Sequence, residues 1–183
     1  SIDTRMRISG LILVLNIAWC SAFSFAQSFI PSDWIGNYEG NMSLSSAGGS
    51  QTVQIAFNFQ EIKTDSIWTY TMKYIRPGQD ALVKDYRIVK QPNGSFVLDE
   101  QDGILIDLPY RNGAFLSIFE VDGMVHCSSM SKIERGIRLE LFGADISRPS
   151  KTTQSVDEKN QAFVVNSFAP SYAQTVVLAK KKP

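Results

Sequence analysis

The chain has 183 residues, and its 18 basic and 18 acidic side chains cancel to a formal net charge of zero. This balance provides no long-range field for nucleic acid or an anionic membrane surface, so we expect neither as a partner. One His and two Cys are too few for a classical zinc site, and they leave a single His for Ser-His-Asp or Cys-His catalysis, which is therefore nearly excluded. We expect no metal and no cofactor. Hydrophobic residues make up 44% of the chain and charged residues 20%, which is typical of a globular protein rather than a disordered one.

Residues 1–26 have the pattern of an export signal. Arg5 and Arg7 form a short basic region, residues 11–20 form an apolar core, and small residues precede a cleavage point after Ala26. The apolar run is too short and too interrupted to span a membrane. The pattern predicts an exported protein, periplasmic or extracellular, with no integral membrane span.

Cys20 lies inside this predicted signal. A lipid-modified cysteine is an alternative there, but the bulky Trp19 before it disfavours lipid anchoring. Cleavage after Ala26 removes Cys20 and leaves Cys127 as the one thiol, so no internal disulfide is expected.

The exported part begins as a series of alternating strands. In residues 53–59 apolar side chains alternate with polar ones, and in residues 68–74 large side chains occupy every second position. A period of two is the signature of a strand with one buried face. A further β-prone run at 82–90 is apolar on both faces, so its inward side chains are not assigned.

Tight turns punctuate the next part of the chain. Asp102-Gly103, Asn112-Gly113 and Asp122-Gly123 each separate two short β-prone runs. Asx-Gly pairs suit hairpins because both central residues tolerate a positive φ. No segment from Asp33 to Ile146 has a helical period. The pattern predicts an antiparallel meander.

A meander of this length predicts an all-β fold, an antiparallel up-and-down β-barrel, because closure removes exposed sheet edges. A β-sandwich is the alternative. Residues 27–183 are expected to form one domain. Its segment 147–160 is polar and aperiodic, and is predicted to be a long loop or a short surface helix. Two later β-prone runs, 162–168 and 175–179, are candidates to close the barrel against the first strand.

The start of the domain carries a weak motif. Trp34, Gly36, Tyr38 and Gly40 follow one another at two-residue spacing. The arrangement resembles the first strand of a lipocalin-like barrel of the calycin superfamily. That resemblance implies a barrel with a ligand cavity and an aromatic plug at its closed end. Lipocalins usually place Gly before Trp, and the C-terminal His of a haem-binding branch is missing here, so no functional residue is carried over.

Inward aromatic residues are the candidate ligand contacts. Aromatic side chains bury a large area, and Tyr adds a hydroxyl that can orient a ligand. The alternative is that these side chains simply fill the barrel. The predicted ligand-binding residues are Trp68, Tyr70, Met72, Tyr74, Phe57, Phe59, Phe115, Phe119 and His126.

Two other groups of residues have side chains capable of chemistry. His126 and Cys127 are neighbours on a predicted strand and therefore face opposite sides, so they cannot form a nucleophile–base pair. His126 is either a ligand contact or a hydrogen-bonded structural residue. The acidic residues around the turn at Asp102 could act in acid–base chemistry or bind Ca²⁺, but a solvated turn explains them more simply. They are Asp99, Glu100, Asp102 and Asp107.

Asn41 and Asn93 each begin an N-glycosylation pattern, which matters only in a eukaryotic host. No catalytic residue is assigned. The favoured function is binding of a small hydrophobic or amphipathic ligand in the barrel. The alternatives are a filled barrel that serves as a protein-interaction or structural module, and a carboxylate-based hydrolase or isomerase.

Overall fold

The computed structural model describes residues 28–182, so the predicted export signal lies outside the described part. The described chain is all-β apart from one short 3-10 turn. The elements are η1 (Pro31–Asp33), β1 (Gly36–Ser46), β2 (Gly49–Phe59), β3 (Glu61–Lys63), β4 (Ile67–Ile75), β5 (Leu82–Lys90), β6 (Phe96–Asp99), β7 (Leu105–Asp107), β8 (Tyr110–Arg111), β9 (Ala114–Val121), β10 (Met124–Ile133), β11 (Gly136–Asp145), β12 (Lys151–Val156), β13 (Ala162–Ser167) and β14 (Tyr172–Lys180). No helix in residues 28–182 is long and apolar enough to cross a bilayer.

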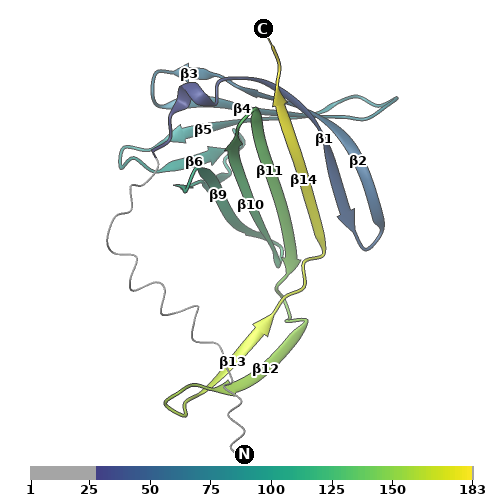
Figure 1. Ribbon diagram of the computed structural model, residues 1–183, viewed down its shortest axis with the longest axis vertical. Helices are drawn as coiled ribbons and strands as arrows, with labels where there is room; N and C mark the ends of the chain where they lie inside the picture. Colours follow the sequence, from purple (N-terminus) through teal and green to yellow (C-terminus); the bar gives the residue numbers. More distant parts are fainter. Residues whose placement is uncertain (1–27, 183) are drawn as a thin grey trace, which may run out of the picture.

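The main sheet has 12 antiparallel strands and curls into a half-barrel (Figure 1). Its order is β7-β6-β5-β4-β2-β1-β14-β11-β10-β9-β8, with β3 added beside β4. The predicted antiparallel all-β fold is confirmed. The last strand, β14, lies between β1 and β11 and pairs with both, so the C-terminal run does join the first strand.

The sheet remains open between β7 and β8. No ladder joins these two strands within the described residues. Leu108 and Pro109 separate them, and Pro109 has no N–H to donate to a ladder. Leu108, between the two strands, and Phe115, the partner of Tyr110, are both buried in the apolar core. A half-barrel therefore replaces the fully closed barrel that the strand count suggested.

Register explains why the alternating residues share one interior. Tyr38 pairs with Phe57, and Phe57 pairs with Met72, so three strands present their large side chains to the same side. All three residues are almost fully buried. Burial of this kind contributes about 1.5–3 kcal/mol for each large apolar side chain. The interior, not the outer surface, is thus the main source of stability.

Aromatic rings close one end of the half-barrel. Trp34, Phe59 and Trp68 are almost fully buried there and pack around Phe29. The Tyr38 hydroxyl donates a hydrogen bond of 2.6 Å to the carbonyl of Trp34, which ties η1 to β1. The predicted role of Trp34 as a plug agrees with this packing.

The hairpin turns form at Asx-Gly pairs. Asn112 and Asp122 have φ values of 51° and 50°, and the glycines that follow them also have positive φ. Both turns join adjacent strands, β8 to β9 and β9 to β10. Local sequence therefore specifies these connections, as predicted.

Residues 147–160 are not a loop or a short helix throughout, because they contain strand β12. This strand pairs with β13 in a separate two-stranded hairpin that projects from the sheet (Figure 1). The segment is rich in Thr and Ser, and the β-branched Thr152 and Thr153 favour extended backbone. Asp157 closes the turn by accepting hydrogen bonds from the backbone N–H groups of Lys159 and Gln161. The polar sequence gives no strand pattern here, and the extended conformation results from pairing with β13.

Every residue of β12 and β13 is exposed. Replacement of residues 150–168 by a short Gly-Ser linker is therefore expected to change the free energy of unfolding by no more than about 1 kcal/mol. Denaturant unfolding of the shortened and full-length chains measures the difference. A shortened chain that fails to unfold cooperatively would show that the hairpin supports the sheet.

Candidate functional site

The half-barrel encloses a cavity between β4–β6 and β9–β11. Its volume is about 110 Å³. The apolar part of the lining includes Met42, Met72, Leu98, Phe115 and Met130. A cavity of about 150 Å³ can hold a benzene ring. This one is smaller, so it suits a smaller group or one end of a longer molecule.

Three tyrosines line the wall formed by β4 and β5. They are Tyr70, Tyr74 and Tyr86. The rings of Tyr70 and Tyr86 stack with centroids 6.3 Å apart and planes 17° apart. Glu100, which follows β6, and Lys84 on β5 complete this wall, and the Lys84 Nζ lies 5.7 Å from the centroid of the Tyr74 ring. The wall therefore combines electron-rich ring faces with one carboxylate and one ammonium group.

These phenols are held in the neutral form. Burial raises the pKa of Tyr70, and the neighbouring Tyr74 and Tyr86 raise it further. Burial and the adjacent Glu100 carboxylate raise the pKa of Tyr86 to about 12. At neutral pH each hydroxyl is available as a hydrogen-bond donor.

Stability should fall at alkaline pH because of these phenols. Below pH 10 they are protonated in the folded and unfolded states alike. Between pH 10 and pH 12 the unfolded tyrosine ionises first, since the pKa of Tyr86 is about 12 only in the folded chain. Denaturant unfolding across this range is expected to show decreasing stability, and a smaller decrease in Tyr86→Phe. Equal slopes in the two proteins would contradict the assignment.

The opposite wall carries a buried hydroxyl pair. Ser117 on β9 and Ser128 on β10 are direct partners in register, and their Oγ atoms lie 2.6 Å apart. Ser117 is buried, with 6% of its surface exposed. Each hydroxyl has both donor and acceptor capacity, so the pair can still bind a polar group in the cavity.

His126 lies beside the cavity, next to one of its lining residues. Its ring stacks on Phe119 with centroids 5.0 Å apart, and a hydrogen bond joins its Nδ1 to the Tyr172 hydroxyl. Gly143 lies between His126 and Tyr172 in the sheet, because it pairs with both. A Cβ at Gly143 would be 2.6 Å from Cε1 of Tyr172. The missing side chain makes room for the Tyr172 ring. These contacts match the structural alternative for His126.

The predicted ligand contacts divide into two groups. Five line the cavity: Tyr70, Met72, Tyr74, Phe115 and Phe119. Trp68, Phe57 and Phe59 belong to the packed interior, and His126 lies outside the lining. The alternative that such residues fill the barrel thus applies to Trp68, Phe57 and Phe59.

Sequence reasoning missed several polar members of the lining. Lys84 and Tyr86 lie in the run 82–90. This run has apolar residues on both faces, so the sequence does not show which face points inward. In the sequence Glu100 belongs to an acidic cluster around a turn, and no pattern marks Ser117 or Ser128 as inward-facing. Alternation along 84, 86 and 88 is the signal that could have identified the inward face of β5, because Ile88 is fully buried.

The other acidic residues of that turn have structural roles. The Asp99 carboxylate accepts a hydrogen bond from the Gln101 N–H at 2.7 Å, and Asp102 accepts one from the Ile104 N–H at 3.1 Å. The described residues contain no group of three side chains able to hold a metal ion. Asp99 and Asp102 therefore stabilise the turn, which agrees with the simpler interpretation for these two residues, whereas Glu100 belongs to the cavity lining.

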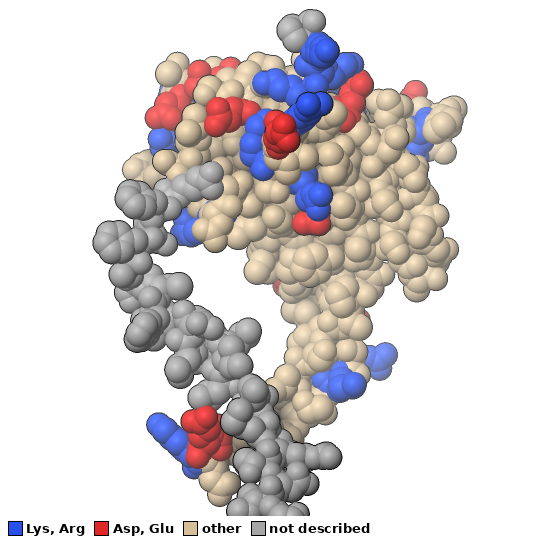
Figure 2. Space-filling model, in the orientation of Figure 1, with Lys and Arg blue, Asp and Glu red and all other residues tan. Residues whose placement is uncertain are grey.

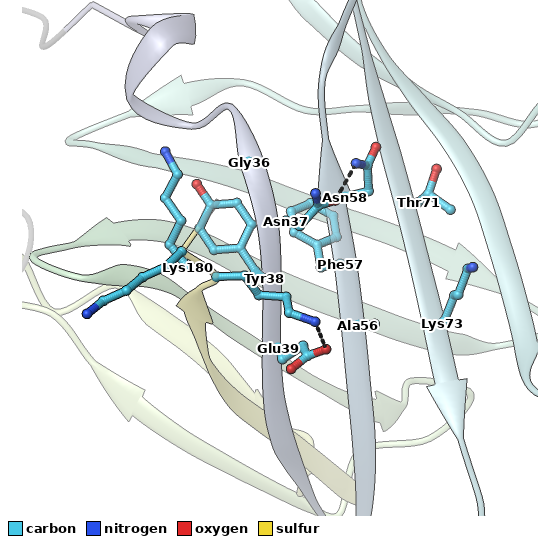
Figure 3. Close-up of a pocket in the computed structure, with 12 residues that line it drawn as sticks. Gly36, Asn37, Tyr38, Glu39, Ala56, Phe57, Asn58, Thr71, Lys73 and Lys180 are labelled. Carbon is cyan, nitrogen blue, oxygen red and sulfur yellow. Dashed lines mark hydrogen bonds and ion pairs between the residues drawn. The ribbon is translucent and has the colours of Figure 1, made fainter.

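A second groove, of about 610 Å³, lies on the outer side of β1, β2 and β4 (Figure 3). Four of its polar residues form two pairs: Lys181 pairs with Glu39 at 2.6 Å, and Asn58 donates to Asn37 at 2.7 Å. Figure 3 shows Lys73 and Lys180 on opposite sides of it. Figure 2 shows basic and acidic side chains intermixed at this end of the molecule. Because Lys73 and Lys180 lie apart, the groove does not bring these two charges to one point, and we take the inner cavity as the candidate site.

No protein-family model matches the chain, and no curated protein matches it. The half-barrel is compatible with a lipocalin-like architecture, but membership of the calycin superfamily is not shown.

Proposed function

We propose that the chain is an exported, lipocalin-like protein that binds a small hydrophobic or amphipathic molecule inside the half-barrel. Export is inferred from the signal pattern of residues 1–26. Binding is inferred from the interior cavity, which supports the prediction made from alternating aromatic residues.

One observation carries the proposal, namely the composition of the cavity wall. Apolar side chains such as Met72 and Phe115 form most of the lining, and a few polar groups converge on the same space from opposite walls. Ligand sites usually combine a mainly apolar surface with a small number of placed polar groups. Tyr86 and the Ser117–Ser128 pair are such groups, because they offer hydrogen bonds beside a mainly apolar lining.

Native mass spectrometry of the protein purified from its own host tests the proposal. A stoichiometric added mass, extracted and identified as an amphipathic or apolar molecule, is the expected result. A Phe115→Trp variant, which fills the cavity, should lose that mass, whereas Ile118→Trp on the exposed outer side of the same strand should retain it. A bare mass in the native protein, together with no binding of added ring-sized probes, would contradict the proposal.

A protein-contact role is the second candidate, and the projecting hairpin favours it. Val156, Phe163 and Val164 are large, apolar and about half exposed on β12 and β13. Exposed apolar surface of this kind commonly marks a contact with another protein. Retention of the native binding partner by the full-length chain, and its loss on removal of residues 150–168, would favour this candidate.

The carboxylate-pair enzyme has less support. Glycoside-type acid–base chemistry needs two carboxylates about 5–10 Å apart. Among the described residues that line the cavity, Glu100 is the single carboxylate. The site is thus better suited to holding a molecule than to transforming one.

A further inference from the structure

The two charged groups of the cavity lie at different depths. On β5 the inward side chains are Lys84, Tyr86 and Ile88, and burial increases in that order from exposed through half-buried to fully buried. Ile88 pairs with Leu98 on the antiparallel strand β6. Two residues beyond this pair, Glu100 lies at the same level as Tyr86, because the two strands run in opposite directions. Glu100 is therefore one step deeper than Lys84, and the carboxylate is the charge nearest the interior.

The rings around this carboxylate favour a positive charge. Tyrosine ring faces attract cations within about 6 Å of the centroid. The protein uses this attraction itself, since the ammonium of Lys84 lies 5.7 Å from the centroid of Tyr74. Lys84 is exposed, so its long side chain can swing away from the cavity without losing buried contacts.

We infer that the cavity binds a protonated amine carried on a compact apolar body, with the ammonium held between Glu100 and the rings of Tyr70 and Tyr86. The apolar body lies against the methionine and leucine side chains deeper in the cavity. An anionic head group in the same position would face the Glu100 carboxylate and the negative faces of the rings. The inference rests on the proposed function, because it concerns the ligand of the same cavity.

Three probes of similar size and different charge test the inference: benzylamine, benzyl alcohol and benzoate. Calorimetric titration of the purified chain at pH 7 compares their dissociation constants. Benzylammonium is expected to bind at least tenfold more tightly than benzoate, with benzyl alcohol between them. Benzoate binding as tightly as benzylammonium would overturn the inference.

Substitutions in the cavity wall test whether Glu100 causes the preference for the amine. Glu100→Gln should weaken benzylammonium binding about tenfold and leave benzyl alcohol unchanged, because it removes a charge and keeps the shape. Glu140→Gln on the exposed outer face of β11 is the matched control and should change neither. Lys84→Met should strengthen benzylammonium binding, since it removes the competing cation. Equal binding of benzylammonium to Glu100→Gln and to the unchanged chain would overturn the inference.

Failure of the inference and failure of the proposed function give different results. Binding of benzyl alcohol with no preference for the amine would overturn the inference and leave a small-ligand cavity in place. Binding of none of the three probes would overturn the inference, and together with a bare native mass it would also contradict the proposed function.

Discussion

Replacement of Trp68 by Ala is expected to lower the free energy of unfolding by about 3–5 kcal/mol, the largest loss predicted for a single interior residue. Trp68 has 0% of its surface exposed. Its ring stacks on Phe59 with planes 11° apart and meets the edge of Phe29 at a centroid distance of 5.3 Å. Truncation to Ala removes these contacts and leaves a cavity where the aromatic plug closes the half-barrel.

The Trp68 indole N–H distinguishes the Ala and Phe substitutions. Among the described residues, Nε1 of Trp68 is the one buried side-chain nitrogen or oxygen without a hydrogen-bond partner. Phe has no such group, so Trp68→Phe loses ring area but leaves no donor unsatisfied, and it should cost less than half as much as Trp68→Ala. Denaturant unfolding followed by far-UV circular dichroism measures both variants.

A surface control separates packing from general effects of substitution. Ile118 is also on a strand of the sheet but is 73% exposed. Ile118→Ala is expected to change stability by less than about 0.5 kcal/mol. A loss in Trp68→Ala no greater than that of Ile118→Ala would show that the aromatic plug does not stabilise the fold.

Gly40→Ala should destabilise the chain by at least about 2 kcal/mol, because the change forces two strands apart. A Cβ at Gly40 would lie 2.2 Å from the backbone oxygen of Val177 on β14 and 2.9 Å from Cγ2 of Val176. The backbone of β14 cannot move away freely, since β11 holds its other edge. The pairing of β1 with β14, which joins the first strand to the last, would therefore be strained.

The matched control for Gly40→Ala is Gly48→Ala. Gly48 lies in an exposed turn, and the one atom near a Cβ there is Oγ of Ser46, at 3.7 Å. Its substitution should change the unfolding midpoint very little. Equal midpoints for the Gly40 and Gly48 variants would show that β1 and β14 do not approach as closely as the geometry requires.

Local patterns in the sequence were enough to predict the strands and most turns. A period of two at 53–59 and 68–74 reports on one strand and its own two faces, and an Asx-Gly pair reports on its own turn. Such signals need no knowledge of distant residues, and β2, β4 and the turns at Asn112 and Asp122 formed where they were expected. Strand β12 escaped prediction because its polar residues are extended through pairing with β13, not through burial.

The candidate site was only partly predictable for a related reason. Trp68 and Tyr70 share one strand face and follow the same alternation, yet Trp68 fills the closed end while Tyr70 lines the cavity. Depth along the half-barrel depends on which residues of other strands lie at the same level. No pattern within residues 68–74 contains that information.

The sequence by itself determined an antiparallel all-β chain with large side chains directed to one interior, because alternation and turn chemistry are local properties. The tertiary structure decided three further features: the opening between β7 and β8, the projection of the β12–β13 hairpin, and the depth of Glu100 relative to Lys84. Each depends on which strands pair and in which register, over sequence separations from the neighbouring β12 and β13 to Tyr38 with Lys180. Register results from the packing of the whole interior, which is why it became visible only in the folded molecule.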